Sequence, residues 1–364
     1  MPTVERLDHG GAVGRGLSFG LSGLAAQAAG TTALDYHAEL RAVIDLAVLA
    51  EEHGLDAVWT CEHHFSEDGF LPAPLVVLGA IAERTERVTI GTDIMLAPMW
   101  DPVRLTEEAA VVDQLSSGRV VLGFGAGYRD AEFEGLGFRR ADRVKRMVEC
   151  IRVLREGWSG KPVEGLGVSR PGTALPITPL PYQDGGPPLW LGGFVEAAVR
   201  RARRLCDGYI APQIGPGGLR KRIAWLHDEA PLDGFAVAMS IIAFVAAKDA
   251  WRTVRPGMAL TEAQYRKWQQ EAGDLPELQG KAWDAGATDD RPPAAVVVGT
   301  PADCIEMLRP FAEILAGLPG DGAGHLTARL TYPGIDPAAN RESVRLFADE
   351  VVPALRELAH ASRT

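Results

Sequence analysis

The stretch that decides the fold is "RVTIGTDIMLAPMWDPVRLTEEAAVVDQLSSGRVVLGFGAG" (87–127). It opens with a short run rich in branched residues, "RVTIGTDIML", which is typical of a buried strand. A helical pattern follows in "PVRLTEEAAVVDQLSSG", which Gly118 ends, and "RVVLGFGAG" then reads as a second strand. A strand, a helix and a strand in succession are typical of parallel strands joined by a right-handed crossover. The stretch therefore predicts an α/β fold.

The same alternation continues on both sides of this unit. Further strands are expected at 16–23, 56–60, 187–193, 207–212, 235–246 and 325–333. Helices are expected at 34–53, 73–85, 139–158, 195–205, 217–228, 301–316 and 340–359. Eight strand–helix units favour a closed (β/α)8 TIM barrel over an open doubly wound sheet. Residues 1–364 then form a single domain with an N-terminal extension (1–13), a Pro/Gly-rich excursion (159–188) and an insertion (248–293).

Composition narrows the possible partners. The chain carries 48 acidic and 37 basic residues, a formal charge of −11, which argues against nucleic acid or an anionic membrane as partner. No apolar run approaches the length of a membrane span, and no signal peptide is visible at the N-terminus. The four cysteines show neither metal-binding nor redox spacing, so a cytoplasmic location is expected.

A candidate catalytic motif, "CEHHF" (61–65), follows the strand at 56–60. Chemistry in a TIM barrel occurs where strands end. A metal site is not expected, because adjacent residues of an extended chain point to opposite sides and no further ligand motif accompanies His63 and His64. The alternative is that one histidine only caps the next helix or fills a polar rim. The position and the neighbouring Phe65 favour a functional imidazole that works in general acid–base catalysis.

Three other strand ends carry unusual residues. Alternating glycines in "GFGAG" (123–127) leave a flat floor for a planar ring, but no helix follows at once, as a dinucleotide fingerprint requires. "LGGF" (191–194) precedes a helix whose free N–H groups suit a phosphate. Asp93 is either an acid–base group or a cap. Aromatic residues near strand ends suggest an apolar or aromatic substrate pocket: Phe19, Phe65, Trp100 and Tyr128.

Taken together, these segments resemble the bacterial luciferase-like flavin monooxygenase family. The resemblance rests on "GLDAVWTCEHHF" (54–65), the segments within 81–137, "PPLWLGGFVEAAVRRARRLCDGYI" (187–210), and the closing "GTPADCIEMLRPF", "HLTARLTYPG" and "SVRLFADEVVPAL". It implies a TIM barrel that binds a reduced flavin, FMNH2 or the deazaflavin F420, at the C-terminal mouth. It also implies that the insertion 248–293 is a mobile lid.

The resemblance assigns roles to individual residues. His63 matches the catalytic histidine, and the bond Asp93–Ile94 matches a non-prolyl cis peptide under the flavin ring. Where luciferase has an arginine for the FMN phosphate, this chain has Ala126, so the phosphate must be held by the helix start at 192–193 or by another cation such as Arg129. The cofactor-binding residues implied are Thr92, Asp93, Ile94, Gly125, Ala126, Trp190, Gly192, Gly193 and Phe194.

The resemblance also predicts the activity. It implies a two-component monooxygenase in which a separate reductase supplies FMNH2, and a C4a-peroxyflavin formed with O2 oxygenates a small organic substrate. No NAD(P)H fingerprint is visible, which is consistent with external reduction. The alternatives are an F420-dependent oxidoreductase that transfers hydride and a flavin-binding protein without turnover. Family members are commonly dimers, so a homodimer packed through the helices after the second and third strands is expected.

Overall fold

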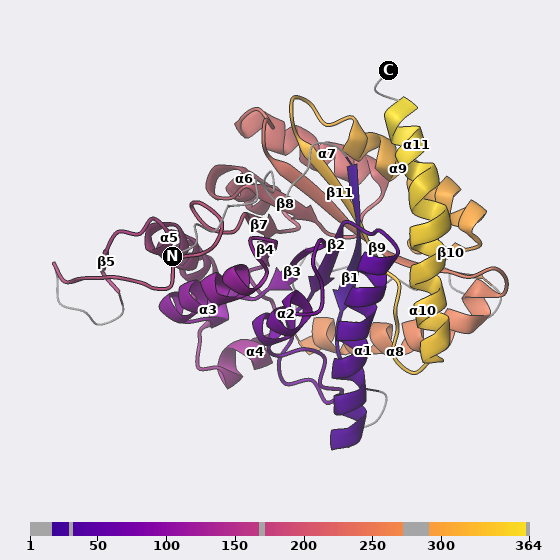
Figure 1. Cartoon of the computed structure of the whole chain (residues 1–364), viewed down its shortest axis with the longest axis horizontal. Coiled ribbons are helices and arrows are strands. Elements are labelled where there is room, and N and C mark those ends of the chain that lie inside the picture. The colour runs from indigo at the N-terminus through magenta and orange to yellow at the C-terminus, as the bar shows by residue number, and fades with distance from the viewer. Residues whose placement is uncertain (1–16, 29–31, 167–171, 272–290, 362–364) are drawn as a thin grey trace, which may run out of the picture.

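The computed structural model describes residues 17–28, 32–166, 172–271 and 291–361. Within them, eight parallel strands close into a barrel, because β9 pairs with both β8 and β11 (Figure 1). The barrel strands are β1 (Leu17–Leu24), β2 (Ala57–Thr60), β3 (Thr89–Met95), β4 (Val120–Phe124), β7 (Leu189–Gly192), β8 (Gly208–Ala211), β9 (Ala236–Val245) and β11 (Ala323–Arg329). The predicted TIM barrel is confirmed.

Helices surround the strands and begin within a few residues of their expected positions (Figure 1). They are α1 (Ala33–Glu52), α2 (Pro74–Ala82), α3 (Pro102–Leu115), α5 (Arg143–Trp158), α6 (Glu196–Leu205), α7 (Pro216–Glu229), α9 (Pro301–Ala316), α10 (Pro337–Leu346) and α11 (Val352–Ala361). A π-helical turn, Phe347–Val351, joins the last two, which the sequence predicts as one helix. None of the described helices is long and apolar enough to cross a membrane.

Several elements were not expected from the sequence. They are the short helices η1 (Ala97–Met99), α4 (Asp130–Gly135) and η2 (Arg140–Asp142), the hairpin β5 (Val163–Glu164) and β6 (Ala174–Leu175), and the strand β10 (Val297–Gly299). The hairpin lies in the predicted excursion, which projects beside α3 and α5 (Figure 1). In the predicted insertion, the described part is one long helix, α8 (Ala250–Glu271). The N-terminal extension at 1–13 and residues 272–290 lie outside the described residues.

Aromatic side chains fill the inside of the barrel. The rings of Trp59 and Trp190 lie 5.0 Å apart, and His325 packs 4.7 Å from Trp190. The strands leave room for these rings by placing glycine beside them: a Cβ added at Gly91 would lie 2.5 Å from the Trp59 ring, and one at Gly208 would lie 2.5 Å from Trp190. The barrel therefore has a solid centre, and only its mouth is open for a ligand.

His325 makes the folded state sensitive to acid. Its Nδ1 bonds to the Ser18 hydroxyl, its Nε2 has no partner among the described residues, and burial lowers its pKa to about 4. The unfolded chain takes up this proton near pH 6.5, so stability is complete above that pH and falls as the pH drops towards about 4. The loss reaches about 3 kcal/mol at most.

We expect His325→Gln to flatten this dependence. Urea denaturation at about pH 7.5 and about pH 5 should show a smaller difference in unfolding free energy for the variant than for the wild type. The exposed His37, changed to Gln, is the matched control and should leave the wild-type difference intact. An equal pH dependence in wild type and His325→Gln would contradict the assignment.

Candidate functional site

A cavity of about 390 Å³ opens at the C-terminal ends of the strands. Its wall is formed by the ends of β2, β3, β4, β7, β8 and β9 together with α5, α6 and α8. Nine residues singled out in the sequence line it together: His63, Asp93, Ile94, Gly125, Ala126, Tyr128, Gly192, Gly193 and Phe194. The fold thus brings most of the predicted site to one place.

The buried carboxylate of Glu132 orients His63. His63 Nδ1 lies 3.0 Å from Glu132 Oε1, and the same oxygen accepts from Arg129 Nη1 at 2.9 Å and from the His64 amide at 3.1 Å. Burial alone would raise the pKa of Glu132, but these donors outweigh it and hold the pKa below its usual range. The ionised acid requires a proton on His63 Nδ1, which leaves Nε2 without a hydrogen-bond partner among the described residues, on a side chain that lines the cavity.

The helix α8 covers His63 from outside the barrel. The Trp268 ring lies 4.4 Å from the imidazole, and Phe70 meets it edge-on at 4.7 Å. The guanidinium of Arg129 stacks on the Trp268 ring, with its carbon 4.2 Å from the ring centroid. Trp268 is almost fully buried, so this part of α8 covers one face of the histidine ring.

His64 points away from His63 to a different acid. Its Nε2 lies 2.9 Å from Glu62 Oε1, and Glu62 also accepts from the Leu96 amide at 2.6 Å and from Trp100 Nε1 at 3.0 Å. Trp100 therefore holds Glu62 in place and does not line the cavity, which corrects its prediction as a substrate-pocket residue.

The floor of the cavity is made by Ile94 and by glycines beside it. The Asp93–Ile94 peptide bond is cis, as the family resemblance predicts. A Cβ added at Gly125 would lie 1.8 Å from Ile94 Cδ1, and one at Gly192 would lie 3.3 Å from Ile94 Cγ2. Gly125 therefore makes room for the Ile94 side chain, which the sequence alone did not indicate.

The turn at 192–194 and two arginines also line the cavity. Tyr209 donates to the Gly193 carbonyl at 2.8 Å, and Arg222 donates to the Phe194 carbonyl at 2.8 Å, which fixes the turn before α6. Arg143 and Arg201 line the same cavity; Arg143 Nη1 donates to the Arg140 carbonyl at 3.3 Å, and neither arginine has a carboxylate partner in the part of the chain that the structure describes. Two unpaired guanidinium groups beside a helix start favour a phosphate or another anion.

Sequence reasoning missed both of these arginines. It considered Arg129 as the phosphate cation, but Arg129 is buried and committed to Glu132 and to the His64 carbonyl. A signal for Arg201 was present, since it lies four residues after Ala197 and so shares the helix face that lines the cavity. Burial and the neighbouring Arg204 lower the pKa of Arg201, as expected for a guanidinium that lacks a counter-ion.

Four further predicted residues do not line the cavity. Phe19 packs outward against α11, since the neighbouring Gly20 faces the barrel interior. Phe65 is 57% exposed and covers Gly135 on the outside. Trp190 lies in the barrel centre, one layer below Gly192. The Thr92 hydroxyl donates to the Gly123 carbonyl at 2.8 Å and accepts from the Gly123 amide, so it ties β3 to β4. Each prediction is corrected accordingly.

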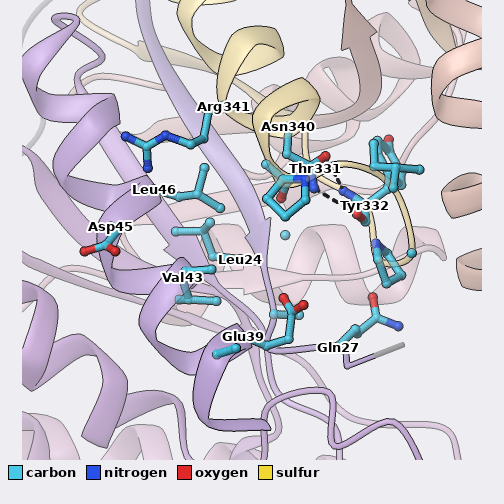
Figure 2. Close-up of a pocket in the computed structure, with 18 of the residues that line it drawn as sticks. Leu24, Gln27, Glu39, Val43, Asp45, Leu46, Thr331, Tyr332, Asn340 and Arg341 are labelled. Carbon is cyan, nitrogen blue, oxygen red and sulfur yellow. Dashed lines mark hydrogen bonds between the residues drawn. The ribbon is translucent and has the colours of Figure 1, made fainter. Parts of the chain in front are cut away.

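A second cavity, of about 340 Å³, lies outside the barrel between α1 and α10. Figure 2 shows Glu39 and Asp45 from α1 on one side and Thr331 and Tyr332 on the other. Asn340 fixes that loop, since its side chain bonds to the Tyr332 amide at 3.0 Å and to the Tyr332 carbonyl at 2.9 Å (Figure 2). No residue in this hollow belongs to the predicted site.

A closed parallel barrel whose mouth holds an acid-oriented histidine, a floor bordered by glycines and two arginines has the arrangement of a TIM-barrel enzyme. Residues 18–317 match the luciferase-like monooxygenase family. The match spans most of the chain, so the protein belongs to this family. It is an oxidoreductase.

Known relatives fall into two groups. The chain is 31% identical over 151 residues to the oxygenase component of the flavin-dependent trigonelline monooxygenase of Acinetobacter baylyi, which covers 41% of this chain and 42% of that protein. It is 27% identical over 340 residues to the F420-dependent glucose-6-phosphate dehydrogenase of Rhodococcus erythropolis. That alignment covers 87% of this chain and 94% of the dehydrogenase. The matches at 31% identity thus span less than half of those relatives.

A solved structure agrees in fold. The oxygenating constituent of the 3,6-diketocamphane monooxygenase from Pseudomonas putida, in complex with FMN, superposes with a TM-score of 0.74. The two chains share 21% identity, and the match covers 93% of this chain and 98% of the other. At this identity the likeness establishes the shared barrel.

The contact between Gly125 and Ile94 gives a prediction for stability. Gly125→Ala should destabilise the protein by about 1–3 kcal/mol, because the added methyl group overlaps Ile94 Cδ1. Ile94→Val removes that atom, so the double variant should lose less stability than the sum of the single changes. Urea unfolding of the four proteins measures this coupling.

Gly217→Ala is the matched control, since nothing lies within 4 Å of a Cβ added there. It should leave stability unchanged or raise it slightly, because alanine suits a helix better than glycine. Strict additivity between positions 125 and 94 would argue against the packing described.

Proposed function

We propose that this protein is the oxygenase component of a two-component system that uses reduced FMN and O2 to oxygenate a small organic substrate. The observation that carries the proposal is the orientation of His63, whose Nδ1 is held by Glu132 and whose side chain lines a cavity that Arg143 and Arg201 also line. Support also comes from the Acinetobacter baylyi relative, which is named as an oxygenase component. A separate reductase as the source of reduced FMN follows from that name.

The residues of the cavity fit a reduced flavin. Arg143 and Arg201 would hold the phosphate together with the turn at 192–194, and the floor at Ile94 and Gly125 would carry the ring. Helix starts and unpaired guanidinium groups are the usual means of binding a phosphate. When bound, the reduced flavin supplies the electrons that activate O2.

The chain itself supplies proton transfer and exclusion of water. His63 Nε2 is placed to take a proton from, or return one to, a group bound in the cavity, while Glu132 holds the other nitrogen. Trp268 and Tyr265 of α8 lie against the imidazole, at ring distances of 4.4 Å and 5.8 Å. Such a cover protects reactive species from bulk water.

The second candidate is an F420-dependent oxidoreductase that transfers hydride without O2. One observation favours it: the Rhodococcus erythropolis dehydrogenase matches 87% of this chain, against 41% for the Acinetobacter protein. A pair of free arginines suits an anionic tail on either cofactor.

We further propose a homodimer that packs through α2 and α3. Val76 on α2 is 72% exposed, and Val111 and Leu115 on α3 are 45% and 47% exposed, which makes an apolar face on adjacent helices. All four cysteines are unpaired and buried, which fits the cytoplasmic location predicted from the sequence.

Anaerobic titration with FMNH2 and with F420H2, followed by admission of air, tests the choice of cofactor. We expect FMNH2 to bind at least about tenfold more tightly than F420H2, and bound FMNH2 to react with O2 at a rate different from that of free FMNH2. Cofactor absorbance and fluorescence report both events. Tight binding of F420H2 with no reaction towards O2 would favour the second candidate.

Variants at position 63 test the histidine. His63→Asn should change the rate of FMNH2 reoxidation on the protein by at least about tenfold, because it removes the proton-transferring imidazole. The Kd for FMNH2 should stay within about threefold, since the anion site is untouched. Glu132→Gln should act in the same direction but more weakly, because it keeps an oxygen opposite Nδ1.

Stopped-flow absorbance and the yield of H2O2 give the two readouts. The exposed His360, changed to Asn, is the control and should behave as wild type. Unchanged reoxidation in a folded, FMNH2-binding His63→Asn protein would remove His63 from the mechanism.

A further inference from the structure

The Asp93 carboxyl group lies on the axis of the barrel at the floor of the main cavity. It belongs to β3, and its hydrogen-bond partner Ser240 belongs to β9, which stands four strands away in either direction around the barrel. A hydrogen bond between opposite walls can form only across the centre. Both side chains line the cavity, and Ser240 is held from behind by the Ser22 hydroxyl at 3.1 Å.

Asp93 has no cationic partner among the described residues. Burial raises its pKa to about 6, and the Ser240 hydrogen bond opposes that rise only in part, so the group is mainly ionised at pH 7. The other cavity carboxylate, Glu62, differs in this respect, because His64, Trp100 and the Leu96 amide all bond to it. A partly buried carboxylate without a counter-ion is costly and is stabilised by an incoming cation.

Three titratable groups that line the same cavity as Asp93 do not supply this charge. Burial raises the pKa of the Cys61 thiol to about 12 and raises the pKa of Tyr265 and of Tyr128 as well, so all three are neutral near pH 7. Arg329 acts on Cys61 and Tyr265, but it donates to Gln27 Oε1 at 2.6 Å and lines the second cavity instead.

The remaining charged groups of the cavity lie elsewhere. Arg143 and Arg201 come from α5 and α6, which follow β4 and β7, and the imidazole of His63 is held by Glu132. The cavity is therefore lined by two guanidinium groups from α5 and α6 and, in addition, by a carboxylate and two neutral phenol rings. Phenol rings and a carboxylate together are the usual surroundings of an organic ammonium group.

We propose that Asp93, with the rings of Tyr128 and Tyr265, forms a subsite for a positively charged nitrogen of the organic substrate. The subsite rests on the proposed function for the identity of its ligand as a substrate, but cation binding itself requires no turnover. Asp93 acts here as the residue that determines specificity, while His63 remains the catalytic residue.

The test compares a cation with a neutral molecule of the same shape. Choline and 3,3-dimethylbutan-1-ol differ by a single N⁺-for-C replacement, and calorimetry measures their binding to the intact protein. At about pH 8 we expect choline to bind at least about tenfold more tightly than the alcohol, and this preference to fall by about tenfold at about pH 5, where Asp93 is protonated.

Asp93→Asn should abolish the preference for the cation at about pH 8, whereas Ser240→Ala should keep it, because the carboxylate remains. Asp93→Glu should also keep the preference for the cation. This variant provides a test if Asp93→Asn does not fold. The control is Glu313→Gln, which makes the same change of charge at a remote and exposed position. This variant should bind choline and the alcohol as the wild type does.

Two results would overturn the proposal. The first is equal binding of choline and the alcohol to the wild type at about pH 8, and the second is an undiminished preference in folded Asp93→Asn. Titration of the same variants with FMNH2 separates this test from that of the proposed function. Loss of FMNH2 affinity in Asp93→Asn, without a cation preference in the wild type, would assign the carboxylate to the cofactor instead.

Discussion

The site depends on one buried carboxylate, Glu132. Burying a charge is costly, and here three donors on one oxygen offset the cost: His63 Nδ1, the His64 amide and Arg129 Nη1. These donors come from the loop after β2 and from the start of α4, so the carboxylate joins the ends of β2 and β4, the strands on either side of β3. Through the stacking of Arg129 on Trp268, it also ties α8 to the barrel. Removing its charge would loosen the imidazole and its cover together.

The cavity is lined by side chains of opposite charge. Arg143 and Arg201 offer positive charge from the helices that follow β4 and β7, and Asp93 offers negative charge on the barrel axis. A bound molecule with a phosphate would be drawn to the first group, and a molecule with a cationic nitrogen to the second. Such a division orders two ligands in one hollow, because each is repelled from the other's place.

The solid centre of the barrel supports this arrangement. Trp59 and Trp190 fill the interior just below the mouth, and glycines on the neighbouring strands give them room. Above them, Ile94 closes the floor against Gly125, so that ligand and core are separated by one layer of side chains. The floor is rigid because close-packed rings leave it no space to yield.

The sequence by itself determined the barrel and the strand ends that carry the site, because strand–helix repeats and strand-end motifs are local patterns. The cis bond at Asp93–Ile94 was implied by the family resemblance alone and is present in the structure. The tertiary structure decided which side chains meet there. Glu132 reaches His63 from a short helix without a strong pattern, and Ser240 meets Asp93 across the whole barrel. It also placed Trp190 below the mouth, since a strand pattern shows which face a residue occupies but not its depth. Contacts between distant segments arise only when the barrel closes, and no local pattern encodes them.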